Sequence, residues 1–174
     1  TRELVANQPY LVLLAARTIS MLGMAFSPVA LAFGVLRLPG GDAGSLSIVL
    51  AAQTLPMVVF MLVGGVVADR YPRSVVLLTG EWLAALAWGA IGVMMLTGYA
   101  PIWLLSVAAA LAGIAGSLIY PALNGIIPDL VPEHVRQRGN AWLAMGASAA
   151  RLAGLVAGGA VVVWLGGGWA MIVA

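Results

Sequence analysis

The sequence contains no cysteine, no lysine and very little charge. Only 8% of its 174 residues are charged and 63% are hydrophobic, and all eight basic residues are arginine. A soluble domain carries charge on about a quarter of its residues, so this composition excludes one. The absence of cysteine excludes disulfide frameworks and thiolate metal sites. A dispersed net charge of +2 gives no reason to expect a nucleic-acid partner.

Long apolar runs with few charges take the place of the missing polar surface. Such runs predict membrane-spanning helices, and no stretch alternates in the way that transmembrane strands do. The predicted spans are residues 9–36, 45–67, 74–97, 101–126 and 140–165, with the start of a sixth at 169. A span needs about 20 residues, so the sixth would be incomplete. We therefore expect one all-helical membrane bundle over residues 1–174, with a polar loop at 128–138.

The arginines outside the spans predict the orientation of the chain. If the N-terminus is cytoplasmic, five arginines lie inside, namely Arg2, Arg70, Arg73, Arg136 and Arg138. Only Arg37 then lies in an external loop. This bias agrees with the positive-inside rule and predicts a multi-pass protein with a cytoplasmic N-terminus.

The turn between the second and third predicted spans has a recognisable sequence, GGVVADRYPR, at residues 64–73. It resembles the signature loop of the major facilitator superfamily, and the matching residues are Gly65, Ala68, Asp69, Arg70 and Arg73. Pro72 stands where that loop usually has glycine, and Ser74 where a second basic residue is common.

Three other segments extend the resemblance over nearly the whole chain. Residues 23–33 look like the first helix of actinobacterial exporters in this superfamily. Residues 121–132, followed by 139–141, are similar to the fourth-to-fifth helix connection of its macrolide and siderophore exporters. Residues 151–159 resemble the antiporter motif of helix five through Gly154, Gly158 and Gly159, with Leu155 in place of its proline.

The resemblance implies the N-terminal six-helix half of a secondary transporter. Such a protein would sit in the inner (plasma) membrane and export amphipathic small molecules by alternating access, exchanging them for protons, with no cofactor or metal. The missing C-terminal half, or a second copy, would be its partner. An alternative is a non-transporting half-module that works only by assembling with itself or a partner. An enzyme is disfavoured because the sequence has no nucleophile–base pair and no metal-ligand spacing.

The resemblance also implies a role for charged residues at the inner ends of the helices. Asp69, Arg73 and Asp129 would form a latch that holds the two halves of the transporter together in one state. The alternative is a solvated loop whose arginines only fix the orientation of the chain.

Three ionisable residues lie inside the predicted spans, where each costs on the order of 3 kcal/mol. Arg17 is shallow enough for its long side chain to reach the cytoplasmic face. Glu81 lies about 10 Å into its helix at 1.5 Å per residue. Arg151 lies about 18 Å deep, near the middle of the bilayer, which makes it the strongest site candidate.

These charges leave several roles open. Glu81 either pairs structurally with Arg17 or Arg151, or takes up the coupling proton. The unpaired arginine would be balanced by an acidic group in the absent half or by an anionic part of the substrate. Gln53 and Asn124 are expected to make hydrogen bonds between helices more often than ligand contacts.

Small residues at four-residue spacing predict tight helix packing. The two series are Ala109, Gly113 and Ser117, and Ala150, Gly154 and Gly158. By helical spacing, Arg151 is expected to share a face with the last two glycines.

Overall fold

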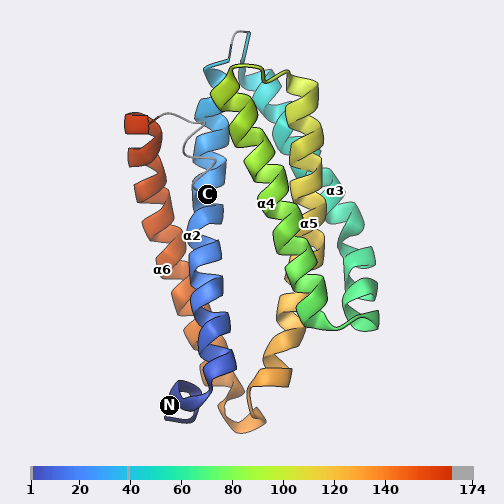
Figure 1. Ribbon diagram of the computed structural model, residues 1–174, viewed down its shortest axis with the longest axis vertical. Helices are drawn as coiled ribbons and strands as arrows, with labels where there is room; N and C mark the ends of the chain where they lie inside the picture. The colour runs from blue at the N-terminus through green and yellow to red at the C-terminus, as the bar shows by residue number, and fades with distance from the viewer. Residues whose placement is uncertain (1, 39, 166–174) are drawn as a thin grey trace.

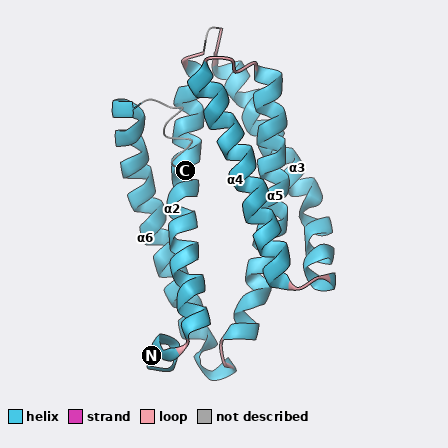
Figure 2. Ribbon diagram, viewed as in Figure 1, coloured by secondary structure: helices cyan, strands magenta, loops and turns pink. Residues whose placement is uncertain are grey.

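The computed structural model describes residues 2–38 and 40–165, which form helices joined by short turns and contain no strand (Figures 1 and 2). The helices are α1 (Arg2–Ala6), α2 (Gln8–Leu36), α3 (Ala43–Arg70), α4 (Arg73–Thr97), α5 (Ile102–Leu130) and α6 (Glu133–Leu165). By length and composition, α2 to α5 and the part of α6 up to Val161 can each cross a membrane. The expected all-helical membrane fold is confirmed.

The largest departure from the predicted boundaries lies between α5 and α6. Helix α5 continues to Leu130 and α6 begins at Glu133, so most of the stretch predicted as a polar loop is helical. Pro132 stands just before α6, and the acidic Glu133 in its first turn favours a helix N-terminus there. The short helix α1 was not predicted. The predicted sixth span, from 169, lies outside the described residues.

Local capping interactions set several helix ends. The side chain of Asn7 accepts a hydrogen bond from the Tyr10 N–H at 3.1 Å and so caps α2. Asp42 caps α3 in the same way by accepting from the Ser45 N–H at 2.7 Å. Helix α4 ends at Thr97, and Gly98 after it has a φ of 72°, in the left-handed region that glycine adopts at little cost.

The spanning helices form two groups. Helix α2 packs along α6, whereas α5 packs against both α3 and α4 (Figure 1). A core cluster from α2 to α5 joins the groups at the end far from α1, and its largest fully buried members are Leu31, Val35, Val49, Ile91 and Leu105. A second cluster, around Leu4 and Tyr10, joins α1, α2 and the α5–α6 turn.

Small residues allow the close approaches within each group. A Cβ added to Gly64 or Gly113 would overlap the backbone of Ser117 or Gln53, so α3 and α5 touch directly. A Cβ on Gly154 would lie 2.7 Å from a carbonyl oxygen of α2. The predicted packing role of the small-residue series is confirmed.

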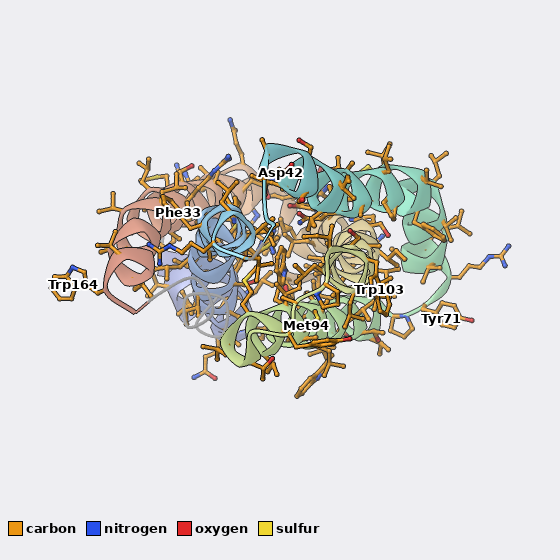
Figure 3. All side chains as sticks on the ribbon, turned by 90° about the horizontal axis from the view of Figure 1, so that it is seen from above. Phe33, Asp42, Tyr71, Met94, Trp103 and Trp164 are labelled. Atoms are coloured by element: carbon orange, nitrogen blue, oxygen red, sulfur yellow. The ribbon has the colours of Figure 1, made fainter. Side chains whose placement is uncertain are left out.

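The outer surface of the bundle is apolar and ends in aromatic residues. Seen from above, the labelled Trp164 and Tyr71 point outward on opposite sides of the bundle (Figure 3). Trp164, Trp103 and Tyr99 are exposed near the end far from α1, and Tyr71 is exposed in the α3–α4 turn. Exposed aromatic rings at both ends of apolar helices are typical of the two membrane–water interfaces.

Candidate functional site

An ion pair lies inside the membrane-spanning part of the bundle. Arg17 of α2 is 8% exposed, and its Nη1 lies 3.8 Å from Oε1 of Glu81 on α4. The hydroxyl of Ser20 lies 3.4 Å from Oε2 of the same carboxylate. The structure therefore pairs Glu81 with Arg17 and not with Arg151. The expected reach of Arg17 to the cytoplasmic face is wrong, because a nearby carboxylate offsets the cost of burying the guanidinium.

Glu81 also lines a cavity of about 690 Å³ between α2, α3, α4 and α5. This volume lies within the usual range of about 300–1,000 Å³ for small-molecule pockets. Other lining residues are Ser20, Met24, Gln53, Met57, Trp88 and Tyr120. The side chain of Gln53 makes no hydrogen bond within the described part of the chain, contrary to the role expected for it, and it faces this cavity instead.

At the α3–α4 turn, Arg73 bridges two helices. Its Nη1 donates to the carbonyl oxygen of Gly125 and lies 3.1–3.2 Å from the carboxylate oxygens of Asp129, both on α5. Asp69 and Arg70 are exposed, and neither makes an ion pair with the residues described. The structure thus joins two members of the expected latch and leaves the third, Asp69, at the surface.

The remaining candidates lie apart from the cavity. On α6, Gly154 and Gly158 are buried and Gly159 is half-buried, whereas Arg151 is exposed. The face that was expected to join Arg151 to the two glycines is therefore split. Gly65, beside the buried Gly64, is half-buried, and a Cβ there would meet open space.

Asn124 of α5 is exposed, and its side chain makes no hydrogen bond in residues 2–38 and 40–165. The bond between helices that was expected for it is therefore not seen.

A polar cluster at the α1 end was missed by sequence reasoning. Three contacts link residues more than 120 positions apart: Asn7 Nδ2 to the Leu130 carbonyl at 2.7 Å, the Tyr10 hydroxyl to the Gly139 carbonyl at 2.7 Å, and Glu3 to His134 at 2.8 Å. They hold α1 and the start of α2 against the α5–α6 turn. The only sequence signal was the helix-capping pattern at Asn7 and Pro9.

Comparison with known proteins identifies the family of this helical bundle. Residues 10–174 match the model of the Major Facilitator Superfamily, so the chain belongs to that family of membrane transporters. It is accordingly a multi-pass membrane protein and not an enzyme.

Three relatives are similar over roughly two thirds of the chain or more. The chain is 33% identical to "Efflux pump terG" of Aspergillus terreus over 67% of its own length and 22% of the relative's. It is 28% identical to "Macrolide efflux protein A" of Streptococcus pyogenes, over 68% of this chain and 29% of the relative. It is 31% identical to the "Uncharacterized MFS-type transporter YfiS" of Bacillus subtilis, over 78% of this chain and 32% of the relative. The chain thus spans at most about a third of each relative. No solved structure matches it.

Proposed function

We propose that this chain belongs to a transporter that exports amphipathic small molecules in exchange for protons. Two of the relatives are described as efflux proteins, which supports the direction of transport. The observation that carries proton exchange is the pair of Arg17 and Glu81 beside a cavity within the membrane span. A carboxylate in such a position is a natural proton acceptor.

The geometry of the pair suggests how a proton could change the conformation. Arg17 lies on α2, which packs with α6, and Glu81 lies on α4, which packs with α5. The deprotonated carboxylate attracts the guanidinium across the boundary between the two helix groups. Protonation removes that attraction and lets the groups separate slightly. A purely structural pair would hold them together throughout transport.

The latch of Asp69, Arg73 and Asp129 would supply the second element of alternating access. The bond from Arg73 to Asp129 ties α4 to α5 and leaves Asp69 free to engage another part of the transporter. Asp69→Glu should then retain more transport than Asp69→Asn. Equal transport by the two variants would contradict the latch and favour a loop that only fixes orientation.

The exposed position of Arg151 indicates that a group outside the described residues balances its charge. A guanidinium exposed on the middle of a membrane helix is costly unless an opposite charge or water reaches it. We assign that role to an acidic group in the remaining half of the transporter or in a second copy, or to an anionic part of the substrate. Wild-type transport by Arg151→Gln would contradict it. The adjacent Gly154, Gly158 and Gly159 would let α6 slide on α2 during exchange.

The proposed location is the plasma membrane with a cytoplasmic N-terminus. Helix α1 and the α3–α4 and α5–α6 turns lie toward the same end of the bundle (Figure 1), and most arginines are near them. The chain has no cysteine, so single cysteines can report its topology. In intact cells, an impermeant maleimide should label Thr97→Cys and leave Arg138→Cys unlabelled. The reverse pattern would overturn this orientation.

The decisive experiment uses the full-length protein in lipid vesicles with an imposed pH gradient. Labelled erythromycin, a macrolide, should accumulate when the lumen is acidic, and a protonophore should abolish accumulation. Glu81→Gln should abolish it and Glu81→Asp should keep part of it. Accumulation that does not depend on the pH gradient, or that persists in Glu81→Gln, would refute proton coupling through this residue. No movement of any amphipathic compound would favour the assembly-only alternative.

A further inference from the structure

The carboxylate of Glu81 has unused capacity to accept hydrogen bonds. Its two oxygens lie 3.5 and 3.4 Å from the Ser20 hydroxyl, and Oε1 lies 3.8 Å from Arg17 Nη1. Hydrogen bonds in which one partner is ionised are normally about 2.5–2.9 Å long, so all three contacts are weak. The Glu81 side chain is 38% exposed, whereas that of Arg17 is 9% exposed. Glu81 is among the residues that line the cavity, and Arg17 is not.

The walls around Glu81 have a consistent chemistry. Trp88 and Tyr120 contribute aromatic rings, and Met24 and Met57 contribute polarizable thioethers. Aromatic faces attract cations, and methionine adapts to ligands of irregular shape. Glu81 is the only charged residue among the described residues that line the cavity.

We propose that this cavity is a binding site for an organic cation, a protonated amine or onium group on an apolar aromatic body. The cation takes the open side of the Glu81 carboxylate, and its body lies among the aromatic rings and methionines. Arg17 repels the cation less than Glu81 attracts it, because the carboxylate lines the cavity and the buried guanidinium does not. An anion of the same shape would meet the carboxylate first and be rejected.

The cation site would explain how a substrate is exchanged for a proton, and this role rests on the proposed function. A proton and the cation would compete for the same carboxylate, so that only one occupies it at a time. The titratable groups around that carboxylate within the described chain are Arg17 on α2 and Tyr120 on α5; α3 contributes the neutral Gln53.

Two probes of nearly identical shape and opposite charge test the site. Tetraphenylphosphonium and tetraphenylborate are titrated separately into the full-length protein in lipid nanodiscs, and heat of binding is recorded. The phosphonium should bind saturably, and Glu81→Gln should weaken it by about tenfold or more, because a charge partner is lost. Glu81→Asp should weaken it much less. Binding of the borate should be weaker than that of the phosphonium and should not fall in Glu81→Gln.

A second pair of variants tests the cavity without touching the charge. A Cβ on Gly89 would meet open space, so Gly89→Leu fills the cavity without a backbone clash. It should abolish phosphonium binding. Ala90→Leu, at the next position on the exposed side of α4, should leave binding unchanged. Melting temperatures near that of the wild type would show that both variants are folded.

The outcomes separate this inference from the proposed function. Phosphonium binding that is unaffected by Glu81→Gln or by Gly89→Leu would overturn the cation site, even if proton-driven export of erythromycin stands. Equal affinity for phosphonium and borate would also overturn it. Phosphonium binding that depends on Glu81, in a protein without proton-driven transport, would support the site and remove the proposed function.

Discussion

Two adjacent glycines on α3 give a direct test of how closely α3 and α5 approach. A Cβ on Gly64 would overlap the carbonyl oxygen of Ser117 and lie 2.8 Å from its carbonyl carbon. A Cβ on Gly65 would have no atom within 4 Å. Gly64→Ala and Gly65→Ala are therefore the same chemical change, one residue apart, in opposite environments.

The expected difference follows from two opposing effects. Replacing glycine by alanine inside a helix stabilises it by about 0.8–1 kcal/mol, and this gain applies to both variants. At Gly64, α3 and α5 must also separate to admit the methyl group, and overpacking of this kind costs about 1–3 kcal/mol. Gly65→Ala should therefore equal or exceed the wild type in stability, and Gly64→Ala should be about 1–3 kcal/mol less stable than Gly65→Ala.

The free energy of unfolding can be measured by titrating the purified protein from mild detergent into SDS while following helix content. The comparison between the two variants matters more than either value, because both share the same helix and the same detergent. If Gly64→Ala is as stable as Gly65→Ala, α3 and α5 do not touch at Ser117. The two helices would then not be close-packed at this position.

Three further predictions concern helix ends and the α1 end of the bundle. The pKa of Asp42 in the folded protein lies below its ordinary value of 3.8, because the Ser45 N–H donates a hydrogen bond to the carboxylate. The ionised Asp42 therefore stabilises the fold above pH 3.8, and this stabilisation is lost as the pH falls through the lowered pKa of the folded state. The gap in melting temperature between wild type and Asp42→Ala should therefore close in that range and stay constant at neutral pH. Tyr10→Phe removes the donor to the buried Gly139 carbonyl and should cost about 1–3 kcal/mol in SDS unfolding; no loss would mean the bond is absent in the membrane. Leu4→Ala empties a site that is 1% exposed and should cost about 2–5 kcal/mol by the same measurement, whereas no change would mean that α1 is detached.

The spanning helices could be predicted because the physics that places them is local. Apolar runs long enough to cross lipid must be helical, since only a helix satisfies its own backbone in a bilayer. The same reasoning predicts the part of each helix that lies in lipid, and it does not predict how far the helix continues beyond the lipid. It therefore placed the start of α6 at Asn140, seven residues after Glu133, where the helix begins. That first part of α6 is polar and helical, and the sequence indicates this only through Pro132 and the acidic Glu133.

The candidate site depended on contacts that the sequence does not encode locally. Depth estimates identified Arg17 and Glu81 as costly charges but could not choose a partner for Glu81, because that depends on which helices are neighbours. The contact of Glu3 with His134 spans 131 positions and has no motif. Helix α1 has only five residues and is held by the burial of Leu4 and by such contacts, not by its own helix propensity.

The charges inside the span limit where this half of the transporter can meet lipid. Arg17 and Glu81 carry opposite charges 3.8 Å apart within the bundle, so together they add no net charge there. Arg151 is exposed, and a guanidinium in the middle of an apolar helix is costly when it faces lipid. The strongly apolar exposed residues of α3, such as Leu62 and Val58, carry no such penalty. The side of α6 that carries Arg151 should therefore face protein or a water-filled path, and α3 can accept lipid. In detergent, Arg151→Leu should then be as stable as the wild type, because the exposed guanidinium does not stabilise this half. In the full-length protein, the same substitution should abolish transport. A loss of stability without a loss of transport would place the partner of Arg151 inside the described bundle and refute this argument.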